Sequence, residues 1–251
     1  MDWDGTTSLT RAGWAGIMAD VFVENLPRLP DENDDVRRTF AWAELSKLNG
    51  RPSIHQMARL AELVGQRGGV AADAAEYQDE FQRRLAALVR SRFDALHAGR
   101  CVADDLLVPG ARALLEALRA RGIVLTLASG TPLPQVREEA ERLDVARYFD
   151  AIHAPPDLHD RDFSKRGIIA RILDAQRMDG AALLAFGDGP VEIIETKAVG
   201  GMAVAVACDE NDPASGRFDP WKRESLLAAG ADAVVADFRD TSDILKAILG
   251  A

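Results

Sequence analysis

Short apolar runs alternate with amphipathic stretches through the second half of the chain, from about Pro109 onward. The apolar runs cover residues 123–128, 181–186, 202–207 and 233–235, with a weaker one at 149–153. Runs of this length and composition predict strands that are buried on both faces. Helical spacing fills the segments between them, at 110–121, 132–143, 164–175, 190–199, 221–229 and 242–249. The alternation predicts an α/β fold, a doubly wound parallel sheet with helices on its faces.

The segment from Ser8 to Asp105 has a different pattern, because it contains no strand-like run. Apolar positions at helical spacing predict amphipathic helices at about 13–25, 31–48, 52–64 and 72–96, the second of which stops at Asn49 and Gly50. We therefore expect two domains. An all-helical domain of residues 9–105 is inserted into an α/β core domain of residues 1–8 and 106–251, at the ligand-binding edge of the sheet.

Composition narrows the class of protein. The 251 residues are 47% hydrophobic and 28% charged, as in an ordinary globular protein, and no apolar run approaches the roughly 20 residues of a membrane span. The first residues do not resemble a secretory signal, so we expect a cytoplasmic protein. The two cysteines, Cys101 and Cys208, are far apart and are interpreted as unpaired, small apolar residues.

The net charge of −10 argues against nucleic acid or an anionic membrane as partner. A small anionic substrate stays possible, because one metal ion and one lysine can reverse the local field. The sequence does not distinguish a monomer from a homodimer.

Two carboxylates, Asp2 and Asp4, lie two residues apart and are followed by Gly5 and Thr6. Ligands of α/β sheets bind at the carboxyl ends of strands, where both carboxylates could face one pocket. Gly5 would allow the backbone to turn beside a bound anion. Taken alone, the motif also fits a solvated turn.

Ser129, Gly130 and Thr131 directly follow the apolar run 123–128. A hydroxyl and free backbone N–H groups in such a loop can bind phosphate oxygens. The alternative is that Ser129 or Thr131 only caps the next helix.

Lys165 lies in the first turn of a predicted helix, where the helix dipole disfavours a positive charge. An anion or a carboxylate cluster opposite it would explain the position. The alternative is an exposed lysine, with Asp162 or Ser164 as the helix cap.

Asp188 follows a buried apolar run and lies between two glycines, with Glu192 one turn into the next helix. Magnesium prefers oxygen ligands and takes only one or two protein carboxylates beside water and phosphate oxygens. Asp188 is therefore a candidate metal ligand, although a turn residue is an equal alternative.

The order of these four elements resembles the haloacid dehalogenase (HAD) superfamily, whose motifs match residues 2–6, Ser129, Lys165 and 187–192. The helical segment resembles the C1-type cap of that superfamily. The resemblance implies a Mg2+-dependent phosphatase that forms an aspartyl phosphate on Asp2. It implies Asp4 as the proton-transfer residue, Ser129 and Lys165 as phosphate-binding catalytic residues, and Mg2+ held by Asp2, Asp4 and Asp188.

The same resemblance implies further binding residues. Glu192 would orient groups around the metal site. Substrate would contact the loops of the core and, as a weaker expectation, polar cap residues: Gly5, Thr6, Gly130, Thr131, Arg51, His55 and Gln56. For the cap residues the alternative is a plain helix stop and a surface histidine.

The expected substrate is a small phosphorylated metabolite, such as a sugar phosphate or a phosphoglycolate-like compound. The carboxylate of Asp4 favours phosphoryl transfer over carbon–halogen cleavage. A phosphomutase of the same superfamily would keep all four motifs, and a phosphonate-cleaving enzyme would need a cap lysine, for which Lys47 is a poor candidate.

One feature departs from the family pattern. The first motif normally ends an apolar strand in the middle of the sheet, whereas only Met1 precedes Asp2 here. We expect the loss of that strand to leave two neighbouring strands with unpaired backbone groups. A shortened chain or a natural loss would both explain it, and the second would fit a catalytically silent protein that binds a metabolite.

Overall fold

The computed structural model of the chain describes residues 1–48, 52–157 and 164–250. It divides into two compact units, one of Met1–Ala12 with Arg92–Ala251 and one of Gly13–Ser91. The domain limits drawn from the sequence, at residues 8 and 105, stay a prediction. No helix among the described residues is long and apolar enough to span a membrane.

The first unit contains two parallel sheets. Strands β1 (Thr126–Ala128) and β2 (Ala151–His153) form one sheet. Strands β3 (Leu184–Gly187), β4 (Met202–Val206) and β5 (Ala233–Val235) form the other, in the order β3-β4-β5. All pairings are parallel, which confirms the predicted α/β fold with a parallel sheet.

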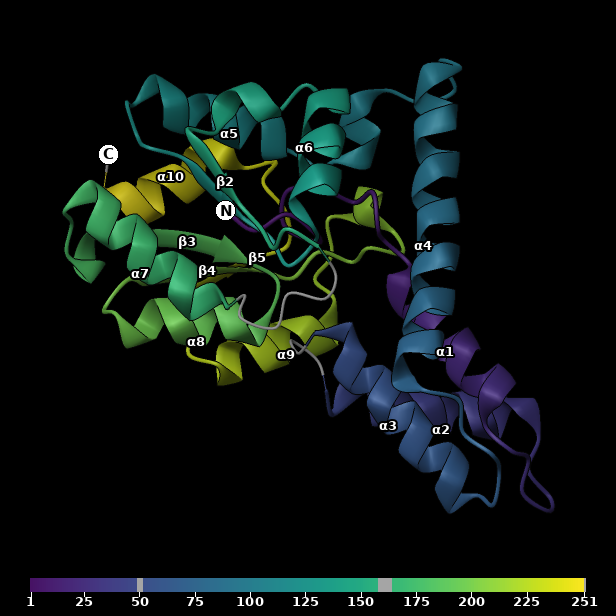
Figure 1. The fold of residues 1–251 in the computed structure, drawn as a ribbon. Coiled ribbons are helices and arrows are strands. Elements are labelled where there is room, and N and C mark those ends of the chain that lie inside the picture. Colours follow the sequence, from purple (N-terminus) through teal and green to yellow (C-terminus); the bar gives the residue numbers. More distant parts are fainter. Residues whose placement is uncertain (49–51, 158–163, 251) are drawn as a thin grey trace. The chain divides into compact units, whose positions relative to one another are not determined.

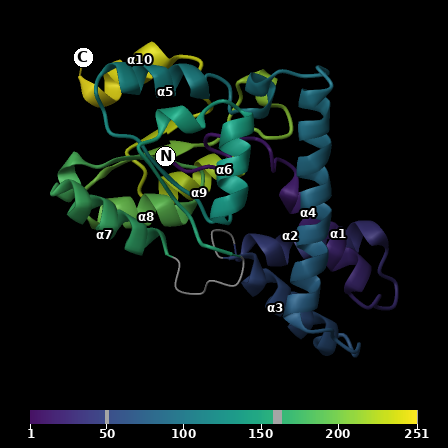
Figure 2. The ribbon, with the colours of Figure 1, turned by 45° about the horizontal axis from the view of Figure 1, so that its top comes forward.

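Helices separate the strands along the chain and lie on both sides of them. Figures 1 and 2 show α5 (Ala111–Ala120) and α10 (Thr241–Leu249) on one side, and α7 (Lys165–Gln176) and α8 (Pro190–Ala198) on the other. The remaining helices of this unit are α6 (Leu133–Arg142), α9 (Pro220–Ala228) and the 3-10 turns η1 (Ala103–Leu106), η2 (Ala146–Tyr148), η3 (Gly180–Ala182) and η4 (Pro213–Ser215). The first residue of β4 is half-buried and the rest of the strand is fully buried, as expected for a strand covered on both faces.

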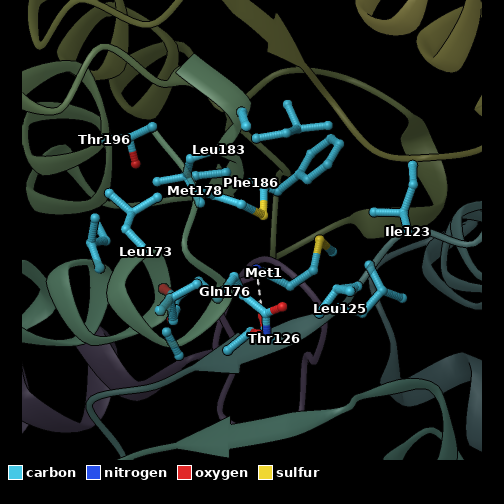
Figure 3. Close-up of a pocket in the computed structure, with 18 of the residues that line it drawn as sticks. Met1, Ile123, Leu125, Thr126, Leu173, Gln176, Met178, Leu183, Phe186 and Thr196 are labelled. Atoms are coloured by element: carbon cyan, nitrogen blue, oxygen red, sulfur yellow. Dashed lines mark hydrogen bonds between the residues drawn. The ribbon is translucent and has the colours of Figure 1, made fainter. Parts of the chain in front are cut away.

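Met1 and Asp2 lie between the two sheets and bond to both. The nitrogen of Met1 donates to the oxygen of Thr126 at 2.9 Å, and the amide of Ala128 donates to the oxygen of Met1 at 2.9 Å. The amide of Asp2 donates to the oxygen of Phe186 at 3.0 Å on β3. Figure 3 shows Met1 beside Thr126 at this point. Among the described residues, β1 and β3 therefore belong to separate sheets, and Met1 and Asp2 bond to both.

The predicted strand at 123–128 forms a ladder only over its last three residues. The predicted strand at 181–186 likewise starts as a 3-10 turn and becomes a strand at Leu184. Both shortened strands lie at the division between the two sheets, where Met1 bonds to β1 and Asp2 bonds to β3. Cys101 and Cys208 are free, as predicted.

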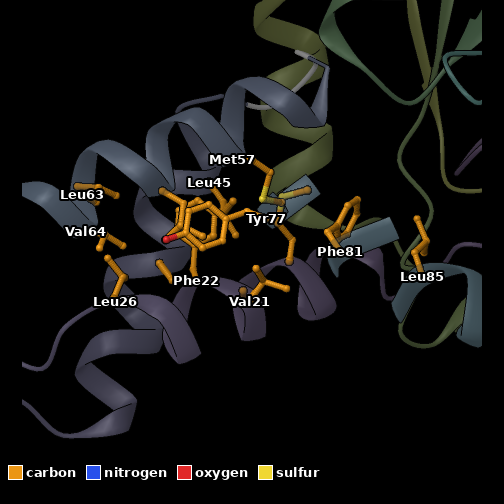
Figure 4. Close-up of a cluster of buried hydrophobic side chains, with 14 residues drawn as sticks. Val21, Phe22, Leu26, Leu45, Met57, Leu63, Val64, Tyr77, Phe81 and Leu85 are labelled. Carbon is orange, nitrogen blue, oxygen red and sulfur yellow. The ribbon is translucent and has the colours of Figure 1, made fainter. Parts of the chain in front are cut away.

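The second unit is all-helical, as the sequence predicts. Its helices are α1 (Trp14–Asn25), α2 (Asp34–Ser46), α3 (Ser53–Gln66) and the first part of α4 (Ala74–His97). Their apolar faces meet in one core, which includes Phe22, Met57, Tyr77 and Phe81 (Figure 4). This core gives the unit its own source of stability. The predicted helix stop at residues 49–50 lies outside the described residues.

Candidate active site

The segment after Asp2 folds into a tight turn. The carbonyl of Trp3 accepts from the amides of Thr7 and Ser8, and Gly5 has a φ of 66°. A Cβ on Gly5 would lie 2.1 Å from Oδ2 of Asp188. Only glycine tolerates both this conformation and this approach, so Gly5 lets the first motif pack against the Asp188 carboxylate.

Lys165 contacts two carboxylates and a backbone carbonyl. Its Nζ donates to Oδ1 of Asp2 at 2.6 Å and to the carbonyl of Ala128 at 2.6 Å, and lies 3.0 Å from Oε1 of Glu192. Burial alone would lower the pKa of Lys165, but Asp2 and Glu192 raise it above the usual lysine value. Lys165 is therefore a half-buried, charged group rather than an exposed lysine.

Ser164 caps the helix that carries Lys165, since its hydroxyl accepts from the amide of Gly167 at 3.1 Å. We predicted either a carboxylate cluster opposite Lys165 or a helix cap at Ser164. Both occur in the structure. Asp162 and the rest of 158–163 lie outside the described residues.

A second lysine, Lys222, binds the other side of the site. Its Nζ donates to Oδ2 of Asp188 at 2.7 Å and to Oε1 of Glu210. Our sequence reasoning missed both Lys222 and Glu210. Lys222 lies in the first turn of α9, the same dipole-disfavoured position that drew attention to Lys165, so the signal was present.

Asp4 is held separately from Asp2. Thr131 Oγ1 donates to Asp4 Oδ2 at 2.7 Å, and Arg11 Nη1 lies 3.3 Å from Asp4 Oδ1. Arg11 in turn contacts Oε2 of Glu139 at 2.6 Å. The Trp3 indole N–H, 3.0 Å away, donates to the same Glu139 oxygen. Glu139, on α6, therefore connects the first motif to this helix and holds Arg11 against the Asp4 carboxylate. The sequence analysis did not identify Glu139.

Ser129 lies next to this group and is fully buried. Its hydroxyl accepts from the amide of Thr131 at 3.0 Å, and its own amide donates to the carbonyl of His153 at 2.9 Å. No side chain caps α6, so the alternative role of Ser129 and Thr131 as helix caps is wrong. The loop instead places the Thr131 hydroxyl on Asp4.

The sequence matches the model of the haloacid dehalogenase-like hydrolases over residues 1–200. The chain belongs to this family. A phosphoglycolate phosphatase from Rhodospirillum rubrum is 28% identical over 221 residues, which are 86% of this chain and 85% of that protein.

Two solved structures show the fold of the haloacid dehalogenase-like hydrolases over nearly the whole chain. A haloacid dehalogenase-like protein of unknown function from Agrobacterium tumefaciens is 13% identical with a TM-score of 0.68, over 99% of this chain and 97% of that one. A HAD family hydrolase from Deinococcus radiodurans, solved with bound phosphate and sodium, is 15% identical with a TM-score of 0.60. The match covers 99% of this chain and 93% of that one. The predicted family and fold are confirmed.

The charges in this hydrolase favour a divalent cation. Four carboxylates, those of Asp2, Asp188, Glu192 and Glu210, pair with the ammonium groups of Lys165 and Lys222. Burial raises the pKa of Asp188 to about 6 and also raises the pKa values of Asp2 and Glu192. The carboxylates thus resist ionisation in this cluster, and a divalent ion bound there would stabilise their charged forms.

The donor set also suits magnesium. Among the described residues, no group of three or more His, Cys, Asp or Glu side chains forms a metal cluster. A site of two carboxylates completed by a backbone carbonyl and water is, however, what Mg2+ commonly accepts. Asp2, Asp188 and the carbonyl of Asp4 fit this description.

The remaining predicted substrate residues fall into two groups. Gly5, Thr6, Gly130 and Thr131 belong to the loops around Asp4, and the buried Thr6 hydroxyl has no hydrogen-bond partner in 1–48, 52–157 and 164–250. His55 is exposed and Gln56 is buried, both on α3 of the helical unit. Arg51 lies outside the described residues.

Proposed function

We propose that this hydrolase is a Mg2+-dependent phosphatase of small phosphorylated metabolites that works through an aspartyl phosphate on Asp2. The observation that carries the proposal is the different placement of two neighbouring carboxylates. Lys165 binds Asp2 at 2.6 Å, whereas Thr131 and Arg11 bind Asp4. Different surroundings let one carboxylate serve as nucleophile and the other as acid and base.

The first half-reaction breaks the bond between phosphorus and the leaving oxygen. Lys165 binds Oδ1 of Asp2, and no described residue donates a hydrogen bond to Oδ2. Oδ2 therefore attacks phosphorus, while Asp4 gives its proton to the leaving oxygen. The positive charge of Lys165 reduces the repulsion between the carboxylate and the phosphate.

The second half-reaction returns the enzyme to its starting state. Asp4, now ionised, takes a proton from water, whose oxygen attacks phosphorus and releases inorganic phosphate from Asp2. Ser129 and the loop amides would hold the phosphoryl oxygens in both steps.

Asp2, Asp188 and the carbonyl of Asp4 would hold Mg2+. When bound, the ion supplies positive charge to the phosphate oxygens. Glu192 would orient Lys165, which it contacts at 3.0 Å.

The helical unit would select the substrate, with Arg51, His55 and Gln56 as candidate contacts. The name of the Rhodospirillum relative supports a small phosphorylated acid such as 2-phosphoglycolate as substrate. The net charge of −10 supports a small molecule rather than nucleic acid.

Phosphate release tests the proposal. The protein would be incubated with Mg2+ and a panel of 2-phosphoglycolate, sugar phosphates, nucleotides and an aryl phosphate. We expect release of inorganic phosphate from at least one small ester, and its loss in EDTA. No release from any compound would contradict the phosphatase assignment. A requirement for a bisphosphate, with phosphate retained on the product, would indicate a phosphomutase instead.

A further inference from the structure

Arg11 lies between Asp4, the proposed acid and base, and the buried carboxylate of Glu139. Its Nη1 donates to Oε2 of Glu139 at 2.6 Å and to Oδ1 of Asp4 at 3.3 Å. Its Nη2 donates to Oε1 of Gln135 at 3.0 Å. Burial alone would lower the pKa of Arg11, which is 8% exposed, but Asp4 and Glu139 raise this pKa above the usual arginine value. The guanidinium is thus charged, buried and held by these side chains.

One side of α6 supplies partners to both Asp4 and Arg11. Thr131, just before the helix, Gln135 and Glu139 are spaced four residues apart, so they follow one side of it. At the start of this row, Thr131 Oγ1 donates to Oδ2 of Asp4 at 2.7 Å. Further along, the other two side chains accept from Arg11. Asp4 is therefore held at both oxygens, at Oδ2 by Thr131 and at Oδ1 through Arg11.

Further hydrogen bonds hold Arg11 and Glu139 in place. Oε2 of Glu139 also accepts from the indole N–H of Trp3 at 3.0 Å and from the hydroxyl of Thr10 at 2.9 Å. The guanidinium of Arg92 donates to carbonyls on both sides of Arg11 in the chain, those of Leu9, Thr10 and Ala12. Arg11 and Glu139 thus cannot shift without breaking several hydrogen bonds. Glu139 also balances the positive charge of Arg11, so the arginine can orient a neighbour without adding net charge.

We propose that Arg11 is a positioning residue for protonation of the leaving group, and that Glu139 acts through it. Arg11 holds Oδ1 of Asp4, which fixes the plane of the carboxyl group and directs its proton at the leaving oxygen. In this step the bond between phosphorus and the leaving oxygen breaks, and its electron pair stays on that oxygen. The proton moves from the carboxyl of Asp4 to the same oxygen. The inference rests on the proposed function, because both residues act through Asp4.

Two esters whose leaving groups differ in basicity test this role. Protonation matters more for 4-methoxyphenyl phosphate than for 4-nitrophenyl phosphate, because nitrophenolate is stable enough to leave without a proton. We expect Arg11→Met to lower kcat/KM by about 100-fold for the methoxyphenyl ester and by less than about fivefold for the nitrophenyl ester. Arg67→Met is the matched control, since Arg67 forms a similarly buried pair with Glu32 at 2.6 Å in the helical unit. It should leave the ratio of the two kcat/KM values unchanged.

A double variant separates positioning from a purely structural role. Asp4→Asn should show the same selective loss, and adding Arg11→Met to it should change kcat/KM by less than about threefold. Glu139→Gln, which keeps the shape of the side chain, should lower kcat/KM for the methoxyphenyl ester by about tenfold. Arg11→Lys keeps the positive charge and should recover part of the activity that Arg11→Met loses toward this ester.

Equal losses for the two esters in Arg11→Met would overturn the inference, and so would additive losses in the double variant. In both cases the parent protein still releases phosphate, so the proposed function stands. Release from neither ester by the parent in Mg2+ would overturn the proposed function and the inference with it. If Arg11→Met does not fold, the two esters are compared in Glu139→Gln, where equal losses would likewise count against the inference.

Discussion

Two half-buried lysines contact different carboxylates of the candidate site. Lys165 and Lys222 each bridge two carboxylates, and each lies in the first turn of a helix. Lys165 contacts Asp2, the proposed nucleophile, whereas Lys222 contacts Asp188, a proposed metal ligand. Attack on a charged phosphate requires a carboxylate nucleophile and a cation, and each lysine contacts a residue proposed for one of these two roles. In the proposed reaction, one lysine would serve the attacking carboxylate, and the other would balance the carboxylates around the cation.

The largest expected effect concerns Asp2 itself. Asp2→Asn removes the nucleophilic oxygen but keeps the shape of the side chain, so kcat should fall by about 10⁴-fold or more. Phosphate release measures it, with circular dichroism to show that the fold is kept. Asp243→Asn, on the exposed face of α10, is the control and should keep full activity. Activity of Asp2→Asn within tenfold of the parent would refute the nucleophile assignment.

Lys165→Met should lower kcat by about 10² to 10³-fold, the effect of losing one charged donor at a reacting group. Lys197→Met is the matched control, because Lys197 forms a salt bridge to Asp232 at a more exposed position. It should change kcat less than twofold. Similar losses in both variants would mean that Lys165 acts on the stability of the fold rather than on the reaction.

The pH dependence of the metal-free protein probes the Asp188 cluster. Burial raises the pKa of Asp188 from 3.8 to about 6, so the folded state holds its proton more tightly than the unfolded chain. The free energy of unfolding should therefore decrease as the pH rises from 4 through 6, by up to about 3 kcal/mol. Urea unfolding in EDTA at pH 4.5 and 7.5 measures this.

Asp188→Asn should remove this part of the pH dependence, and saturating Mg2+ should reduce it. An identical slope in the parent, in Asp188→Asn and in Mg2+ would show that other groups cause it.

Gly5→Ala and Gly13→Ala form a matched pair that tests the packing of Gly5 against Asp188. Both residues have positive φ, 66° and 89°, but only a Cβ on Gly5 meets another group within 4 Å. Both variants should lose about 1 kcal/mol of stability. Only Gly5→Ala displaces Asp188, so only it should weaken Mg2+ binding, by about tenfold or more, in calorimetric titrations. Equal Mg2+ affinities in the two variants would contradict this packing.

Lys222→Met should have the smallest effect and the opposite sign. The ammonium of Lys222 holds an oxygen of Asp188, so its removal should tighten Mg2+ binding about fivefold and leave kcat at saturating Mg2+ within threefold. Calorimetry and phosphate release measure the two quantities. A loss of kcat as large as that of Lys165→Met would erase the distinction between the two lysines.

The sequence predicted the strands and helices that depend on the residues of one short segment. Apolar runs marked β3, β4 and β5, and helical spacing marked the helical unit. The position of Lys165 in a first helical turn indicated a carboxylate cluster opposite, and the structure places Asp2 and Glu192 there. The same argument applied to Lys222 would have found its cluster.

Other features could not be predicted because they depend on pairing across the chain. Glu139 accepts hydrogen bonds from Trp3, Thr10 and Arg11, which lie more than 120 residues away in sequence. No spacing rule connects them. The shortened ladders of β1 and β3 likewise depend on what lies between the strands, which their own residues do not specify.

The bond between the amide of Asp2 and the carbonyl of Phe186 has a consequence for folding. The position of Asp2 is set by a strand that follows more than 180 residues later in the sequence. Contacts of such separation form late, because the loop between them must close first. The proposed nucleophile is thus among the last residues to be fixed, so a partly folded chain would not be a weak hydrolase but an inactive one.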